Sequence, residues 1–322
     1  MRWKTDRIGT NCRFLMALLM LLTASSCNLG TTEKEVITEQ PPIPQPAKTK
    51  VVATFLPVYL FTKAVAGNVA DVEILVPPGT EVHEYQGTPK NVRAIALSNV
   101  LIKNGLGLEE FLADTVKNAR NPKLKEIDAS KNIKAIDEIS PIEKAGHDHD
   151  HDHAGGNPHV WLDPILAKQQ VLNIRDGLIS VDSKNKATYE ANSTAYIQQL
   201  ENLHQEFEQT LKQTPNCTFI TFHDAFPYLA KRYNLKQVAV VKIPEDQLSP
   251  KDVQKIIGIV KKYKVKALFS EPGVDNKLLT SLSQDLKLNL QTLDSLETGD
   301  TDPQYYFKAM KANLQTLAAG CK

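Results

Sequence analysis

Three of the eight histidines in this chain lie beside short apolar runs that are far apart in the sequence. His83 follows the run VEILVP, His159 opens the segment PHVWLDP, and His223 ends the run TFITFH. Each histidine alone is typical of a hydrogen-bonded turn residue. If the runs are parallel strands, however, their carboxyl ends lie at the edge where α/β folds bind ligands. We therefore expect the three imidazoles to converge on one cleft.

Acidic residues at the ends of two later runs are candidates for a fourth ligand. Asp294 lies at the end of LQTLDS, whereas Glu271 and Asp275, in SEPGVDN, could equally be turn residues. Three imidazoles and one carboxylate suit Zn²⁺, which prefers four such ligands and binds nitrogen more tightly than Mn²⁺ does. Because only neutral imidazoles bind, affinity should fall below about pH 6.5. An open fourth position would instead suit a zinc hydrolase, but the chain has no H-E-x-x-H motif.

A second group of histidines has a different character. In residues 146–156, aspartates alternate with His147, His149, His151 and His153, and glycines follow. This polar run is a poor candidate for a buried, well-defined site. It is either a solvated loop without a role or a set of weak auxiliary zinc ligands.

The apolar runs predict an α/β fold with parallel sheets. VVATFL, VEILVP, VLIKNG and IKAID (133–137) fall in the first half, and TFITFH, VAVVKI, ALFSEP and LQTLDS fall in the second. Amphipathic stretches such as 90–97 and 250–262 separate them, as expected for strands covered by helices. Four runs in each half predict two similar α/β lobes.

One long helix is predicted between these lobes. Residues 184–213 contain neither glycine nor proline. Their apolar residues, from Tyr189 to Phe207, recur at helical spacing. Thirty residues would span roughly 45 Å, long enough to cross a domain. We therefore expect an N-terminal lobe at 51–183, a linking helix at 184–213 and a C-terminal lobe at 214–322.

The N-terminal segment has the features of an export signal. Four basic residues precede the apolar run Phe14–Ala24, and small residues then lead to Cys27. This arrangement resembles a lipobox, so 1–27 is predicted to be a signal and Cys27 a lipidation site. Ala24 stands where leucine is usual, so cleavage without lipidation stays open. The polar, proline-rich residues 28–50 indicate a flexible tether.

Composition restricts the class of protein. The chain has 322 residues, is 42% hydrophobic and has a formal net charge of +1, which allows two domains and gives no reason to expect nucleic acid as a partner. In an exported protein the two remaining cysteines, Cys217 and Cys321, permit one disulfide or two unlinked thiols.

Four stretches resemble segments of a known family. LVPPGTEVHEYQGTP, NGLGLEEFL, NPHVWLDP and TFHDAFPYLAKRYNL are similar to the solute-binding proteins of zinc and manganese ABC importers, the ZnuA-like family also called cluster A-I. The resemblance runs from about Val51 to the C-terminus. It implies two α/β lobes joined by a single long helix, with the metal buried between them.

By position, the resemblance implies the ligands His83, His159 and His223. The fourth ligand is a carboxylate in some members and a water or another acid in others, and its position falls on Asp294. Manganese-preferring members tend to have glutamate at the third position, so His223 favours Zn²⁺ and leaves Mn²⁺ as the alternative. Some zinc-specific relatives have a disulfide involving the strand that corresponds to ALFSEP. That run has no cysteine here, so a Cys217–Cys321 pair is a hypothesis that departs from the family pattern.

The implied function is transport, not catalysis. The resemblance predicts a monomeric, extracytoplasmic Zn²⁺-binding component that is lipid-anchored and delivers the ion to a membrane permease. A separate ATPase drives that permease, and the chain itself has no phosphate-binding G-x-x-x-x-G-K-[ST] motif. A zinc hydrolase and a surface adhesin, a label sometimes given to such lipoproteins, are the less favoured alternatives.

Overall fold

The computed structural model describes residues 47–136, 156–241, 250–265, 267–273 and 277–322. These residues belong to one compact unit, Ala47–Lys322. The predicted signal, most of the predicted tether, the histidine run at 146–155, Cys27 and Asp275 lie outside the described residues. Among the described helices, none is both long and apolar enough to cross a membrane.

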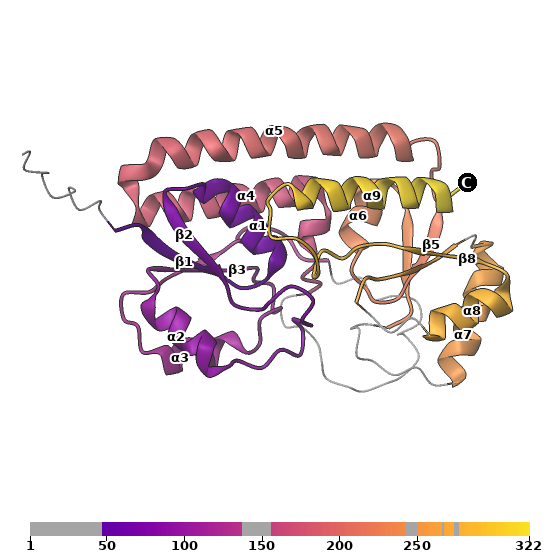
Figure 1. The fold of residues 1–322 in the computed structure, drawn as a ribbon. Helices are drawn as coiled ribbons and strands as arrows, with labels where there is room; N and C mark the ends of the chain where they lie inside the picture. The colour runs from indigo at the N-terminus through magenta and orange to yellow at the C-terminus, as the bar shows by residue number, and fades with distance from the viewer. Residues whose placement is uncertain (1–46, 137–155, 242–249, 266, 274–276) are drawn as a thin grey trace, which may run out of the picture. The chain divides into compact units, whose positions relative to one another are not determined.

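Two parallel four-stranded sheets confirm the predicted fold class (Figure 1). The first has the order β2-β1-β3-β4, from β1 (Thr49–Ala53), β2 (Ala70–Ile74), β3 (Val100–Lys103) and β4 (Lys125–Asp128). The second has the order β6-β5-β7-β8, from β5 (Thr218–Thr221), β6 (Lys236–Ala239), β7 (Ala267–Ser270) and β8 (Asn289–Thr292). In each sheet the chain first adds a strand on one side of the starting strand, β1 or β5, and then continues on its other side. Ligands of such folds bind at this reversal of strand order, so they are expected beside β1 and β5.

One predicted strand was wrong. The fourth strand of the first sheet is β4, and residues 133–136 of the run IKAID form no regular element. Among the described strands, β4 pairs only with β3, and Ile127 is its one buried residue, so an edge strand here needs little apolar sequence. Ile133 and Ile136 instead pack with Val160 and Tyr228. β1 also begins at Thr49, within the predicted tether.

Four of the helices have a proline in the first turn. Pro57, Pro89, Pro164 and Pro227 lie in the first turns of their helices, where the missing N–H costs nothing. The helices are α1 (Leu56–Ala66), α2 (Pro89–Leu97), α3 (Leu112–Ala119), α4 (Pro164–Val181), α6 (Pro227–Arg232), α7 (Pro250–Tyr263), α8 (Lys277–Leu286) and α9 (Tyr305–Gly320).

The linking helix is α5 (Lys186–Leu211), preceded by a short 3₁₀ turn at Ser183–Asn185. Its 26 residues span about 39 Å. One stripe of its surface is buried, at Tyr189, Ser193, Tyr196, Leu200, Leu203, Phe207 and Leu211. α5 packs on α4 and α1 of the first lobe and on α9 (Figure 1), so it braces the whole unit.

The C-terminal helix α9 returns to the first lobe. The Tyr306 ring lies 5.0 Å from the ring of Phe61 in α1, edge to face. Cys321, just after α9, forms a disulfide with Cys217, just before β5. The predicted pairing is therefore confirmed, and it fixes the end of α9 to the second sheet.

Candidate metal centre

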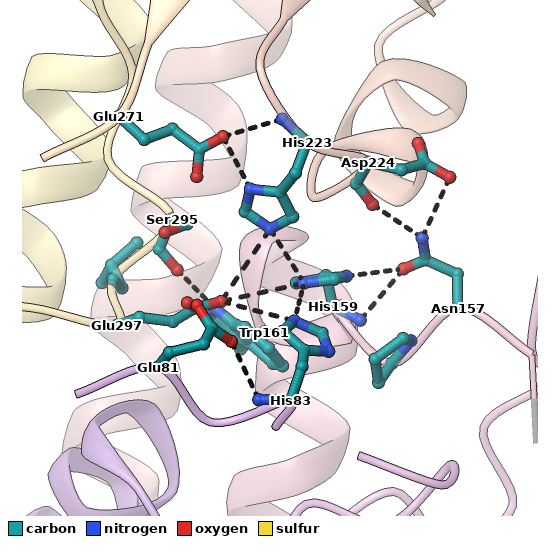
Figure 2. Close-up of polar contacts among 12 residues, drawn as sticks. Glu81, His83, Asn157, His159, Trp161, His223, Asp224, Glu271, Ser295 and Glu297 are labelled. Atoms are coloured by element: carbon teal, nitrogen blue, oxygen red, sulfur yellow. Dashed lines mark hydrogen bonds and ion pairs between the residues drawn. The ribbon is translucent and has the colours of Figure 1, made fainter. Parts of the chain in front are cut away.

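Four side chains meet between the two sheets (Figure 2). One ligand atom from each of His83, His159, His223 and Glu297 lies within 4.8 Å of the others. The Nε2 atom of His159 is 3.2 Å from the Nε2 atoms of both His83 and His223. The Oε1 atom of Glu297 is 3.7 Å from His159 Nε2 and 4.0 Å from the other two.

These distances suit a tetrahedral zinc ion. Zn–N bonds of about 2.0–2.1 Å put tetrahedral ligands about 3.3–3.4 Å apart, close to the observed 3.2 Å between ring nitrogens. The Glu297 oxygen needs to move inward by roughly half an ångström. If each ring holds its proton on Nδ1, three Nε2 lone pairs face the same point, and a cation bound there would accept all three.

Three of the four side chains lie in segments that follow strands, whereas His159 precedes a short helical turn. His83 lies between β2 and α2, and its backbone N–H donates to Glu81 Oε1 at 2.8 Å. His159 immediately precedes the 3₁₀ turn Val160–Leu162. His223 follows β5 and Glu297 follows β8. The three histidines singled out from the sequence are thus brought together.

The four side chains differ in exposure. His223 is fully buried, His159 is 2% exposed and His83 is 6% exposed. The Glu297 side chain is 12% exposed. A cation held here would lose its water shell to protein ligands, and the carboxylate is the member nearest to solvent.

Polar partners behind the rings set their orientation. Glu271 Oε1 lies 2.6 Å from His223 Nδ1 and also accepts the backbone N–H of His223. Burial lowers the pKa of His223, but the Glu271 carboxylate, with Glu297 and Glu81, outweighs that effect and raises the pKa to about 9. Glu271, a weak ligand candidate from the sequence, therefore lies behind a histidine, where such carboxylates orient ligands and raise their basicity.

Asp294 has a different role from the one expected. Its Oδ1 accepts the backbone N–H of Leu296 at 2.7 Å, and its Oδ2 accepts the Tyr305 hydroxyl at 2.7 Å. Burial raises the pKa of this carboxyl, against the lowering effect of those two hydrogen bonds. Among the described residues, the group that could hold a metal ion includes Glu297 and does not include Asp294.

The loop that carries Glu297 is held by the opposite lobe. The Trp161 indole N–H donates to Ser295 O at 2.8 Å. The backbone N–H of Gly79 donates to Glu297 O at 3.1 Å. Sequence reasoning stopped at the strand end and missed Glu297, because tertiary contacts of this kind have no local signal.

Two α/β lobes bridged by a continuous helix, with a cluster of three histidines and a glutamate that could hold a metal ion, are the features expected of a metal-binding solute-binding protein. The family model described as "Zinc-uptake complex component A periplasmic", ZnuA, matches residues 51–320. The chain belongs to this family.

Similar proteins agree with this assignment. The chain is 34% identical over 277 residues to zinc-binding lipoprotein AdcA of Streptococcus pneumoniae, covering 84% of this chain and 55% of the relative, so it spans about half of that protein's length. It is 32% identical over 276 residues to high-affinity zinc uptake system protein ZnuA of Bacillus subtilis, covering 84% and 86%. The structure of laminin-binding protein Lmb of Streptococcus agalactiae, described as having adhesin and metal transporting activity, matches with a TM-score of 0.75 and 29% identity. That match covers 86% of this chain and all of the other.

Proposed function

We propose that this protein is the zinc-binding component of an ABC-type importer and captures one Zn²⁺ outside the cytoplasm. The observation that carries the proposal is the convergence of three imidazole nitrogens and one carboxylate oxygen between the lobes. Such a donor set suits zinc, and its three nitrogens favour zinc over manganese. Manganese in the same role is the alternative.

We assign His83, His159, His223 and Glu297 as the four ligands. Two come from the first lobe and two from the second. Because protein side chains then fill all four positions, no position is left for an activated water, which disfavours the zinc hydrolase alternative. The protein binds and releases its cargo without chemistry. The continuous helix α5 restricts the lobes to small relative movements.

The remaining parts of the chain fit delivery to a membrane. Export by the segment 1–27, lipidation at Cys27 and a tether at 28–50 would keep a monomeric protein beside its membrane permease, which a separate ATPase drives. The histidines 147, 149, 151 and 153 would supply weak auxiliary zinc sites, with the tight site elsewhere.

Metal content and competition test the proposal. The chain from residue 28 onward, purified without added metal, should retain about one equivalent of zinc and bind Zn²⁺ more tightly than Mn²⁺. The variant H159A should lose affinity by orders of magnitude. H204A is the matched control, because His204 lies on α5 and contacts Tyr233 instead of the site. Tighter retention of Mn²⁺ would overturn the choice of metal, and equal zinc affinity in H159A and wild type would overturn the site.

Adhesion is a second candidate, favoured by the similarity to Lmb. Binding of the zinc-loaded protein to immobilised laminin tests it, with H159A included because adhesion need not depend on the metal ligands. Absence of saturable binding would rule laminin adhesion out.

A further inference from the structure

We propose that Asn157 is a positioning residue for the metal site, holding His159 in the tautomer that presents Nε2 to the ion and taking its own orientation from the opposite lobe. This inference rests on the proposed zinc site. Asn157 does not belong to the ligand group, but its side chain contacts both a ligand and the residue that follows another (Figure 2).

The orientation of the Asn157 amide is settled by its partners. Its Nδ2 donates to the backbone carbonyl oxygen of Asp224 at 2.7 Å and lies 3.3 Å from the Asp224 carboxylate. Both of those partners are acceptors, so the NH₂ group must face them. Its Oδ1 faces the backbone N–H of His159 at 3.1 Å, a group that only donates.

This orientation fixes the proton on His159. Oδ1 of Asn157 also lies 3.0 Å from His159 Nδ1. An amide oxygen only accepts, so Nδ1 must carry the hydrogen and Nε2 must present its lone pair. Nε2 is the atom that faces His83 and His223. Without Asn157, the imidazole could hold its proton on Nε2 and would then have to lose it before zinc bound.

The same amide connects the two lobes. Asn157 leads into α4 of the first lobe, whereas Asp224 directly follows His223 in the second. Separation of the lobes would therefore remove the acceptors that orient Asn157 and, through it, release His159. An aspartate at this position could still accept from His159 but would place an oxygen against the Asp224 carbonyl. The asparagine amide offers an acceptor to His159 and a donor to Asp224.

The hydroxyl of Tyr228 provides a matched control. It donates to Asn157 O and accepts the backbone N–H of Ile136, so it also joins this segment to the second lobe. Y228F removes that link while keeping the Asn157 side chain. A merely structural role of the segment predicts equal effects of N157A and Y228F, whereas the positioning role predicts an effect of N157A alone.

Zinc affinity by chelator competition and the ¹⁵N shifts of the His159 ring test the proposal. N157A should bind Zn²⁺ about 10- to 100-fold more weakly, as is typical when an outer partner of a ligand is lost. Y228F should stay within about threefold of wild type. In the metal-free protein at pH 8, wild type should show His159 with its proton on Nδ1, and N157A should lose that single tautomer.

Several outcomes would overturn the proposal. Unchanged affinity in N157A, an equal loss in Y228F, or a His159 ring protonated on Nε2 in wild type would each do so. If N157A does not fold, the His159 ring shifts of the metal-free wild type decide, because they require no variant. The ring shifts need no metal, so failure of wild type to bind zinc would refute the proposed function separately.

Discussion

The choice between Glu297 and Asp294 as the fourth ligand predicts opposite effects of two alanine substitutions. E297A removes one of the four converging ligand atoms and leaves three imidazoles. Loss of an outer partner alone typically costs 10- to 100-fold in metal affinity. Loss of a ligand itself should therefore cost about 100-fold or more, which corresponds to at least about 2.7 kcal/mol. D294A leaves every converging atom in place.

D294A should instead reduce stability. Asp294 accepts hydrogen bonds from the Tyr305 hydroxyl and the Leu296 N–H. Their loss should cost about 2–3 kcal/mol, given that hydrogen bonds to charged groups contribute about 1.5–3 kcal/mol each and that the buried carboxylate is itself costly. An unfolding entropy of about 2.1 cal/mol/K per residue over roughly 280 residues then gives a decrease in Tm of about 3–5 °C.

Two measurements on each variant separate these effects. Competition with a chromogenic chelator gives the zinc Kd, and calorimetry of the metal-free protein gives the Tm. We expect E297A to lose affinity with little change in Tm, and D294A to lose Tm with less than a tenfold change in Kd. A loss of 100-fold in D294A together with near-normal affinity in E297A would refute the ligand assignment.

Three further predictions concern the disulfide, pH and the histidine run. Cys217 and Cys321 are 104 residues apart. Replacing both by serine should lower the free energy of unfolding by about 4.7 kcal/mol, or the Tm by about 8 °C, and leave zinc affinity unchanged. A decrease in Tm of less than about 2 °C would contradict this. The pKa of His223 is raised to about 9, so a proton competes with zinc for this ring below that pH. Zinc affinity should therefore fall about tenfold per pH unit as the pH decreases from 9 to 7. A zinc affinity that does not change over this range would contradict the prediction. Deleting residues 147–153 should change the zinc affinity of the tight site by less than threefold and remove the additional weakly bound zinc ions seen in calorimetry. Loss of tight binding would instead place the tight site in the deleted run.

Much of the architecture followed from local patterns. The long helix was predictable because its buried stripe repeats at helical spacing over a segment without glycine or proline. The meeting of His83 and His223 was predictable because each follows a strand of a parallel sheet, whereas His159 precedes a short helical turn. The strand β4 was not, since an edge strand that buries only Ile127 has hardly any apolar signal.

Glu297 could not be found by the same rule. Asp294 occupies the end of the last strand, but the chain turns there. Leu296 has a left-handed backbone with φ of 64°, and Asp294 caps the turn through the Leu296 N–H. The direction of the following carboxylate is then set by the hydrogen bonds of Ser295 and Glu297 to the first lobe. These contacts join segments more than a hundred residues apart, so a strand-end rule selects Asp294 and misses Glu297, the acid that lies beside the three histidines.

The division of the ligands between lobes bears on release. Of the four proposed ligands, His83 and His159 come from the first lobe and His223 and Glu297 from the second, so separation of the lobes would strain the zinc bonds of both pairs at once. α5 and α9 pack against both halves of the unit and limit that separation. We infer that the exit begins with Glu297, the most exposed ligand, since its loss alone leaves a three-histidine site that water can enter. Zinc transfer to excess chelator should accordingly be faster in E297A than in wild type, and an unchanged transfer rate would place the first step at a histidine.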